Sequence, residues 1–459
     1  MTDSPLDRTV WTIAGVVSLG PLMTVLDSTV VNVSLATLGS ELNASLSVIQ
    51  WVTSGYLLAL ALMLPVSGWL VDRVGAKRVY IACFSLFTLT SLLCGAATSA
   101  AMLIACRVLQ GMAGGLLAPM AQMMVARIAG RQVARVMGIM VVPVLIGPIL
   151  GPVLAGVILQ HASWRWIFFI NLPIGVLATA LAVWILPADT HETHRRTFDL
   201  TGFLLLSPGL VMLLHSLERL ASAGATRGAS AVELVAAFVL LALFLWHGVR
   251  RKGAALIDVQ LFRQSTFSAA ASTQFLANAL AYGGQMLLPL YLLIVRSESP
   301  SNAGLLLAPT GLGMMCSYPM MGALTERFGP RVVSSTGAAV ALLGTLPLVL
   351  FGGSSLPMSA LCVALFVRGA GMGSISVPSI TSAYASIPRP MIPVATTAIN
   401  IVQRLGGPVA TTGLAIFLHS RMTGTSQAFV ATFWLLCAIN ILTVLAALRL
   451  PAHAWSTTP

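Results

Sequence analysis

Residues 68–78 read Gly-Trp-Leu-Val-Asp-Arg-Val-Gly-Ala-Lys-Arg and lie between two long apolar runs. A second stretch, residues 322–331, reads Gly-Ala-Leu-Thr-Glu-Arg-Phe-Gly-Pro-Arg and lies between two others. Both follow the pattern Gly-x-x-x-acid-Arg-x-Gly-x-basic, and their first glycines, Gly68 and Gly322, are 254 residues apart. The pattern predicts one ancestral element that was duplicated together with its half of the protein. A duplicated bundle of membrane helices is the architecture of a carrier.

The composition is typical of an integral membrane protein. Charged residues make up 8% of the chain, where a soluble domain has about 25%, and apolar residues make up 57%. The mean hydropathy is +0.92. The formal net charge of +12 does not indicate a nucleic-acid partner, because the basic residues fall in short clusters between apolar runs.

Runs of about 20 apolar residues predict fourteen membrane-spanning helices. We therefore expect an all-α polytopic fold in which two six-helix bundles flank two inserted central helices. On this plan residues 1–190 form the N-terminal bundle, residues 191–265 the inserted pair with its loops, and residues 266–459 the C-terminal bundle. The predicted spans are 9–37, 48–71, 79–98, 101–127, 133–158, 166–186, 200–217, 231–249, 266–294, 301–325, 332–352, 358–383, 395–420 and 428–448.

The connections on the two sides of these spans differ in charge. With the N-terminus inside, seventeen Lys and Arg residues fall on the inner side and five on the outer side. Cytoplasmic loops carry such an excess, so we expect both termini in the cytoplasm. The expected location is the inner (cytoplasmic) membrane of the cell, as a multi-pass protein.

Formal charges inside a span are costly unless they face a partner or water. Away from the ends of the spans, this chain has four: Asp27, Arg107, Arg368 and Arg404. Asp27 shares a helix face with Thr24, and a rise of about 1.5 Å per residue places Asp27 and Arg107 at similar depth. A carboxylate can take up and release a proton as its hydration and neighbouring charge change, whereas an arginine stays charged. We predict that Asp27 couples transport to protons and that Arg107 modulates it; a static ion pair that fixes helix register is the alternative.

Several phrases, in order along the chain, resemble the fourteen-helix drug:proton antiporter branch of the major facilitator superfamily, the EmrB/QacA-like carriers. The duplicated stretch resembles the superfamily's signature between its second and third helices. The resemblance covers nearly the whole chain. Its further phrases are Leu26–Val33, Trp51–Tyr56, Arg107–Gly111, Trp164–Pro173, Phe198–Gly202 and Leu256–Arg263.

The resemblance also implies which residues change contacts during transport. Residues 147–156 resemble a fifth-helix motif that is associated with antiport, although the family usually ends it with Gly-Gly where this chain has Ala155-Gly156. Gly and Pro there allow close helix approach and a bend. In the first loop, Asp72 is expected to act as a latch between two states. The expected conformational-switch residues are Gly68, Asp72, Arg73, Gly75, Lys77, Gly147, Pro148, Gly151, Pro152 and Gly156.

The function implied by the resemblance is export of small lipophilic compounds or drugs in exchange for protons, by alternating access. A major facilitator carrier for one defined metabolite, such as a siderophore, sugar or amino-acid derivative, is the alternative, because the fold does not fix the cargo. We expect no enzyme activity, no cofactor and no metal, and the proton gradient as the energy source. The expected partners are the small-molecule cargo, protons and membrane lipid, with a periplasmic adaptor as an open case and no nucleic acid.

Polar and aromatic residues on the interior faces of the helices are the candidates for contact with the cargo. Amide side chains in membrane helices also hydrogen-bond neighbouring helices, so the sequence leaves both roles open. The candidates are Thr24, Gln110, Gln274, Asn278, Tyr282, Gln285 and Asn400.

Overall fold

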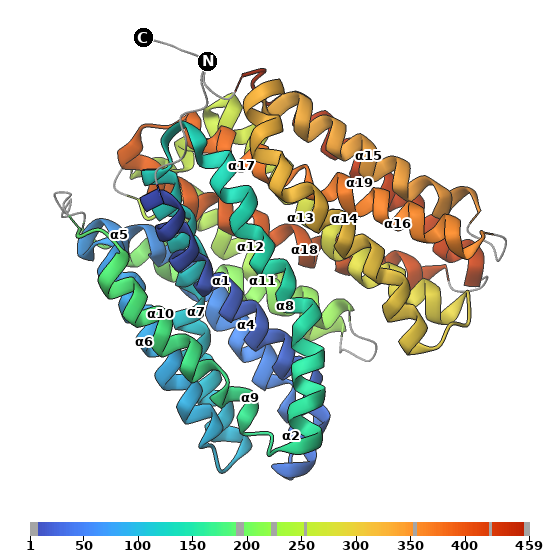
Figure 1. Ribbon diagram of the computed structural model, residues 1–459, viewed down its shortest axis with the longest axis horizontal. Helices are drawn as coiled ribbons and strands as arrows, with labels where there is room; N and C mark the ends of the chain where they lie inside the picture. The colour runs from blue at the N-terminus through green and yellow to red at the C-terminus, as the bar shows by residue number, and fades with distance from the viewer. Residues whose placement is uncertain are drawn as a thin grey trace.

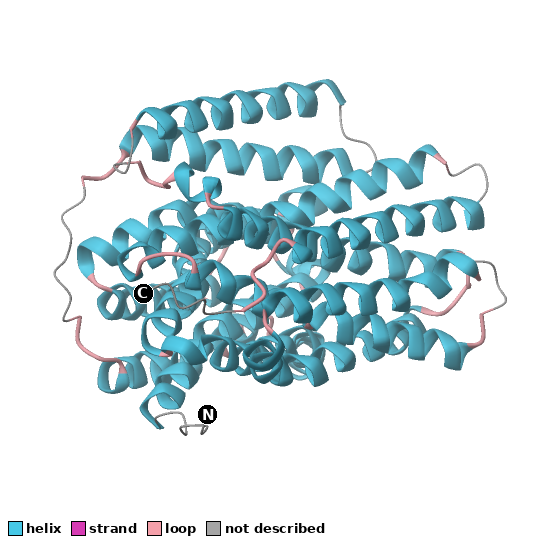
Figure 2. Ribbon diagram, turned by 90° about the horizontal axis from the view of Figure 1, so that it is seen from above, coloured by secondary structure: helices cyan, strands magenta, loops and turns pink. Residues whose placement is uncertain are grey.

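The structure, a computed structural model, is a set of long helices that run between two opposite ends of the molecule (Figure 1). Its described residues form α-helices and short 3₁₀ helices and contain no β-strand, which confirms the expected all-α fold. The view from above shows loops mainly at the two ends of the helices (Figure 2). The structure describes residues 8–189, 197–221, 227–251, 255–351, 356–421 and 425–453.

The first half of the chain forms a bundle in which two spans are interrupted. The second span passes from α4 through the 3₁₀ helix η1 into α5, and Pro65 within η1 lacks a backbone donor. The sixth span is divided into α9 and α10 at Ile170. The helices are α1 (Arg8–Val33), α2 (Leu35–Glu41), α3 (Leu46–Ile49), α4 (Trp51–Met63), η1 (Leu64–Val66), α5 (Ser67–Val74), α6 (Ala76–Gly95), α7 (Ala100–Ile128), η2 (Gly130–Gln132), α8 (Val133–His161), α9 (Trp166–Phe169) and α10 (Asn171–Ile185).

Two inserted helices precede the second bundle. The first, α11, packs on α4 of the N-terminal bundle and on α18 of the C-terminal bundle, and α12 packs on α11. The predicted domain boundary at residue 190 lies outside the described residues, and the division into three parts stays a prediction. The helices are α11 (Leu200–Ala221), α12 (Arg227–Arg250), η3 (Val259–Arg263), α13 (Ser265–Ile294), α14 (Pro300–Phe328), α15 (Pro330–Leu350), α16 (Met358–Gly373), α17 (Ser376–Ala385), η4 (Arg389–Met391), α18 (Ile392–Ser420) and α19 (Thr425–Leu448).

The described residues contain thirteen helices that are long and apolar enough to cross a membrane. They correspond to thirteen of the fourteen predicted spans. The remaining span, 301–325, falls within α14, a helix of 29 residues whose apolar pattern is diluted by Gly, Pro and Ser. The structure is compatible with fourteen spans, and that number stays a prediction.

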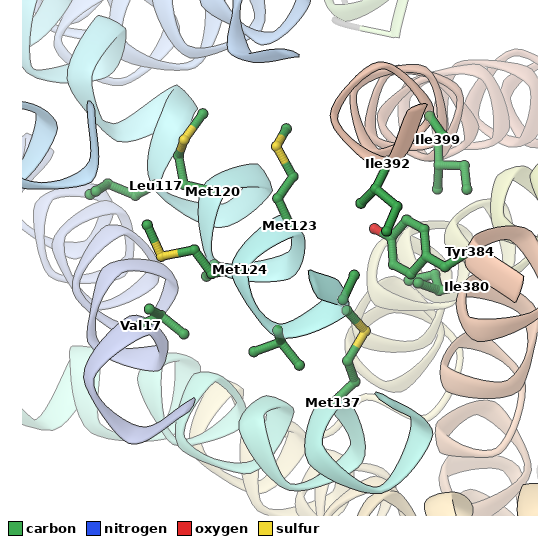
Figure 3. Packing of buried hydrophobic residues seen from close by; sticks show 14 of the residues in the cluster. Val17, Leu117, Met120, Met123, Met124, Met137, Ile380, Tyr384, Ile392 and Ile399 are labelled. Carbon is green, nitrogen blue, oxygen red and sulfur yellow. The ribbon is translucent and has the colours of Figure 1, made fainter. Parts of the chain in front are cut away.

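The two bundles meet near the chain termini and diverge towards the opposite end (Figure 1). At the meeting end, Ser67 Oγ lies 2.7 Å from Thr397 Oγ1, and Asn400 Nδ2 donates to Gln122 Oε1 at 2.8 Å. Apolar packing joins the same helices: methionines of α7 and α8 lie opposite the labelled side chains of α17 and α18, among them Tyr384 (Figure 3). Burial of these side chains holds the end with the duplicated loops together.

Candidate functional site

The carboxylate of Asp27, on α1, is buried and accepts hydrogen bonds from three side chains. Arg107 Nη1, on α7, donates to Oδ2 at 2.5 Å, and both side chains are fully buried. Gln110 Nε2, one turn along α7, and Asn171 Nδ2, at the start of α10, donate to Oδ1 at 3.3 and 2.7 Å. The structure therefore brings Asp27 and Arg107 into direct contact, as their similar depth predicted. Their part in proton coupling stays a prediction.

Arg107 makes further contacts within the same bundle. Its Nη1 also donates to Gln110 Oε1 at 2.8 Å, and its Nε donates to the Val52 carbonyl at 3.2 Å. The guanidinium carbon lies 4.0 Å from the centre of the Tyr56 ring. Among the described residues, Arg107 Nη2 has no hydrogen-bond partner. A buried ion pair is tolerated only when such additional hydrogen bonds offset the loss of hydration. In this pair, Nε and Nη1 of Arg107 have hydrogen-bond partners and Nη2 has none among the described residues.

A close approach of α4 and α7 positions Arg107. A Cβ atom on Gly111 would lie 2.3 Å from the Tyr56 carbonyl oxygen, so a larger residue would push the two helices apart. Because the helices touch here, the Val52 carbonyl and the Tyr56 ring lie against the guanidinium. The Gly in the phrase Arg107–Gly111 thus sets the distance between two helices.

Asn171 is the site residue that the sequence analysis missed. It lies within the phrase Trp164–Pro173, but no role was assigned to it there. Its Nδ2 also donates to Ser91 Oγ on α6 at 3.0 Å, so this one amide joins α10 to α1 and α6. Its carboxylate partner is 144 residues away along the chain, and no spacing rule connects the two. A polar amide at the start of an apolar helix was the available signal.

Four candidate cargo contacts bind other parts of the protein. Thr24 Oγ1 donates to a carbonyl of its own helix at 2.9 Å, and Gln110 belongs to the Asp27 network. Gln274 Nε2 donates to the Ser376 carbonyl at 2.6 Å, which joins α13 to α17. Asn400 joins α18 to α7. These contacts illustrate the alternative role of helix-to-helix bonding.

Three candidates, all on α13, have accessible side chains. Asn278 is partly buried, and its amide donates to the Gln274 carbonyl at 3.3 Å. Tyr282 is 51% exposed, and Gln285 is exposed as well. Spacings of four and three residues place Asn278, Tyr282 and Gln285 on one face of the helix. Contact with cargo stays a prediction for all seven candidates.

The first duplicated loop begins at a contact between the bundles. A Cβ atom on Gly68 would lie 3.1 Å from the Pro393 carbonyl oxygen of α18. Asp72 Oδ1 lies 4.0 Å from Arg127 Nη2 at the end of α7, which is too long for a hydrogen bond. Asp72 is thus close to an arginine of its own bundle, and its action as a latch stays a prediction.

The second part of this loop docks on the segment after α10. Gly75 has a φ of 100°, which favours glycine, and a Cβ atom there would overlap Asp189. Asp189 accepts hydrogen bonds from the backbone N–H of Lys77 at 3.0 Å, and Lys77 Nζ donates to the Leu186 carbonyl at 2.6 Å. Arg73 is exposed. The sequence analysis did not predict the role of Asp189, because this residue is 112 positions away from Lys77 along the chain.

The fifth-helix motif lies on α8, which runs unbroken through its prolines. Gly147 and Gly151 face α1: Thr29 Oγ1 donates to the Gly147 carbonyl at 3.3 Å, and a Cβ atom on Gly151 would overlap Thr29. No atom lies within 4 Å of a Cβ atom on Gly156, so the close-packing argument holds for two of the three glycines. The prolines of the motif are both exposed: Pro148 and Pro152.

A second buried carboxylate holds the ends of the inserted helices. Asp199 accepts hydrogen bonds from the backbone N–H groups of Gly202 and Leu256, at 3.0 and 3.1 Å, and lies 3.0 Å from His247 Nε2. Arg251 Nη1 donates to it at 2.5 Å. Burial alone raises the pKa of Asp199, but the hydrogen bonds with Gly202, His247 and Leu256 outweigh burial and hold the pKa below its usual range.

The inserted helices also touch the first duplicated loop. The ring of Phe198, directly before α11, lies 4.7 Å from the ring of Trp69 on α5. A small cavity beside this contact is lined by Asp72, Asp199 and Leu256, among others. The inserted pair therefore packs against the segment that the resemblance assigns to conformational switching.

Two halves with one repeated loop, apolar helices of membrane-spanning length and a buried ion pair define a polytopic membrane carrier. The sequence profile described as "Major Facilitator Superfamily" matches residues 17–411. The chain belongs to the major facilitator superfamily. It is a multi-pass membrane transporter of small molecules and not an enzyme.

Relatives of this chain include named bacterial proteins. It is 34% identical over 434 residues to the "Multidrug resistance protein B homolog" of Mycobacterium tuberculosis, which covers 91% of this chain and 79% of that protein. It is 32% identical over 456 residues to the "Putative multidrug resistance protein MdtD" of Klebsiella pneumoniae, which covers 96% of this chain and 95% of that one.

A solved structure has the same fold. The major facilitator proton:xylose symporter XylE, bound to 6-bromo-6-deoxy-D-glucose, aligns with a TM-score of 0.67 and 13% sequence identity. The alignment covers 95% of this chain and 94% of that chain. At this identity the similarity concerns the fold alone.

Proposed function

We propose that the protein is a proton-coupled exporter of small lipophilic compounds. The observation that carries the proposal is the position of Asp27, the one carboxylate that the sequence places well inside any predicted span. It is buried and paired with Arg107. A membrane carboxylate with one cationic partner and two amide donors has a proton-dependent set of contacts.

Proton uptake would change this set in a definite way. A protonated Asp27 loses its ion pair with Arg107, whose charge persists, and its oxygens accept weaker hydrogen bonds from Gln110 and Asn171. Helix α1 would then be held less firmly against α7 and α10. Proton binding would shift the balance between two conformations, because the contacts of Asp27 differ between its charged and neutral forms.

Two further observations support the proposal. Similar proteins are named multidrug resistance proteins. The fifth-helix motif packs Gly151 against Thr29, half a turn from Asp27 on α1. A movement of α8 between states would therefore be transmitted to the helix that carries the carboxylate.

We propose that both termini and the duplicated loops lie in the cytoplasm, with the protein in the inner membrane. The charge bias of the loops supports this orientation. The cross-bundle bonds of Ser67 and Asn400 would then close the cytoplasmic side, and the described conformation would be an outward-facing one. A periplasmic adaptor stays a prediction.

The experiment that tests proton coupling uses purified protein in liposomes with an imposed pH gradient and a pH dye inside. The cargo is a compound chosen by a resistance screen in cells that lack their main efflux pumps. Asp27→Asn should abolish gradient-driven transport and cargo-induced proton movement, because Asn resembles the protonated acid but cannot titrate. The control is Glu41→Gln, which changes an exposed acid at the end of α2 and should leave both unchanged.

Gradient-driven transport by Asp27→Asn at the normal rate would show that the coupling group is elsewhere. The screen itself separates the two cargo classes. Resistance to several chemically unrelated compounds supports a drug exporter, whereas accumulation or release of one compound supports a carrier for a single metabolite.

A further inference from the structure

Two of the four charges within the spans are outside the Asp27 network. Arg368, on α16, is buried, and its Nη2 donates to the Leu280 carbonyl at 3.0 Å. Arg404 lies in the middle of α18 and is only partly buried. Within the described part of the chain, Arg404 has no hydrogen bond and no ion pair. A guanidinium has five N–H donors and stays charged, so its position in a membrane helix requires water or a partner.

Arg404 lies where the two bundles face each other. Asn400, one turn earlier on the same face of α18, donates to Gln122 Oε1 of α7, in the other half, at 2.8 Å. The Tyr282 ring packs on Gly407, one turn along α18, where a Cβ atom would lie 2.9 Å from the ring. Arg404, between Asn400 and Gly407 on α18, therefore lies on a face of this helix that is directed towards the other bundle and towards α13.

The charge in this region is unbalanced. The charge of Arg107 is offset by Asp27, which leaves no carboxylate for Arg404 among its neighbours. A group with negative charge and several acceptor oxygens would satisfy the guanidinium, whereas a cation would be repelled.

We propose that Arg404 receives the anionic group of the cargo, and that the carrier exports amphipathic anions rather than lipophilic cations. Such a compound has a carboxylate, sulfonate or phosphate and an apolar body. The exposed ring of Tyr282 offers an aromatic face for that body. The inference rests on the proposed export function and adds the charge of its cargo.

The test compares two dyes that share a xanthene ring but differ in charge. Fluorescein is an anion at mildly alkaline pH, and rhodamine 6G is a cation. Binding is measured by equilibrium dialysis against the protein in nanodiscs of zwitterionic lipid, with empty nanodiscs subtracted. Fluorescein should bind at least about tenfold more tightly than rhodamine 6G, as expected for one charge-assisted contact.

Variants of α18 assign this preference to Arg404. Arg404→Gln should weaken fluorescein binding by about tenfold or more and leave rhodamine 6G unchanged or tighter, while Arg404→Lys should retain part of the preference. The matched control is Arg421→Gln, the same substitution at the exposed end of α18, which should change neither. Preference for rhodamine 6G, unchanged fluorescein binding in Arg404→Gln, or no binding of either dye by folded protein would overturn the proposal.

An anionic lipid headgroup carries the same chemistry as such a cargo. Addition of phosphatidylglycerol to the nanodiscs should leave fluorescein binding unchanged, and full displacement would assign the site to lipid and overturn the proposal. The measurement needs no pH gradient, so it is independent of proton coupling. Asp27→Asn should still prefer fluorescein; if that variant also transports normally, the proposed coupling role of Asp27 fails while the charge preference stands.

Discussion

The two halves of the molecule share one loop pattern but differ in how they hold a buried arginine. In the N-terminal half, Arg107 faces the carboxylate of Asp27 and two amides. In the C-terminal half, Arg368 donates to the Leu280 carbonyl and has no carboxylate among its described contacts. In the N-terminal half, the buried arginine is thus paired with a titratable carboxylate, that of Asp27. In the C-terminal half, the buried arginine is paired with a backbone carbonyl, which does not titrate.

The loops themselves show a similar difference. In the first copy, the carboxylate of Asp189 accepts from the backbone of Lys77. In the second copy, Gly329 has a φ of 81°, and the backbone N–H of Arg331 donates to the Pro451 carbonyl at 3.3 Å. Each loop therefore docks on the segment that follows the last helix of its own half. The docking position is the same in the two copies, but a carboxylate accepts from the backbone N–H in the first copy and a backbone carbonyl accepts in the second.

The largest effect that would separate the halves comes from replacing each buried arginine by Met. Arg107→Met leaves the Asp27 carboxylate buried and unpaired and should lower stability by about 3–5 kcal/mol. Arg368→Met leaves only a carbonyl and should be neutral or stabilising. Thermal unfolding in detergent measures both, and Arg107→Met with Asp27→Asn should recover part of the loss. Equal losses for the two single variants would remove the distinction.

A medium effect is expected at the first glycines of the two loops. A Cβ atom on Gly322 would lie 2.2 Å from Arg135 Cα of α8, whereas one on Gly68 would lie 3.1 Å from a carbonyl oxygen. Gly322→Ala should therefore separate the bundles, at a cost of about 1–3 kcal/mol, and Gly68→Ala should do so much less. Spin-label distances between the exposed positions 78 and 332, in a cysteine-free background, measure the opening. An equal change in both variants would contradict the steric argument.

The smallest effect concerns the inserted helices between the halves. The pKa of Asp199 is lowered in the folded protein, so its contribution to stability is present above the unfolded value of about 3.9 and is lost as the pH falls through the folded value. Hydrogen exchange of the Leu256 amide, corrected for intrinsic rate, should quicken by about tenfold over that range. Asp199→Asn should exchange faster at neutral pH and lose the pH dependence. An unchanged profile in the variant would exclude Asp199 as the cause.

The sequence predicted features that depend on local pattern or depth. The rise per residue placed Asp27 and Arg107 together, and the structure has them in contact. Contacts that close between distant segments were not predictable, because nothing in one helix indicates which turn of another will face it. Asn171 and Asp189 are of this kind. Gln110 was recognised as interior, but its partner, the Asp27 carboxylate, required the packing of α1 on α7.

The placement of α11 has a consequence for the transport cycle. Near one end of this helix, Ser54 Oγ of α4 donates to Glu218 Oε1 at 3.1 Å, and Thr412 Oγ1 of α18 donates to the Leu217 carbonyl at 2.9 Å. Helix α11 is thus hydrogen-bonded to one helix of each bundle. A relative rotation of the two bundles would have to shift or break one of these two hydrogen bonds. Helix α11 would therefore limit how far the bundles can rotate relative to each other before one of these hydrogen bonds breaks.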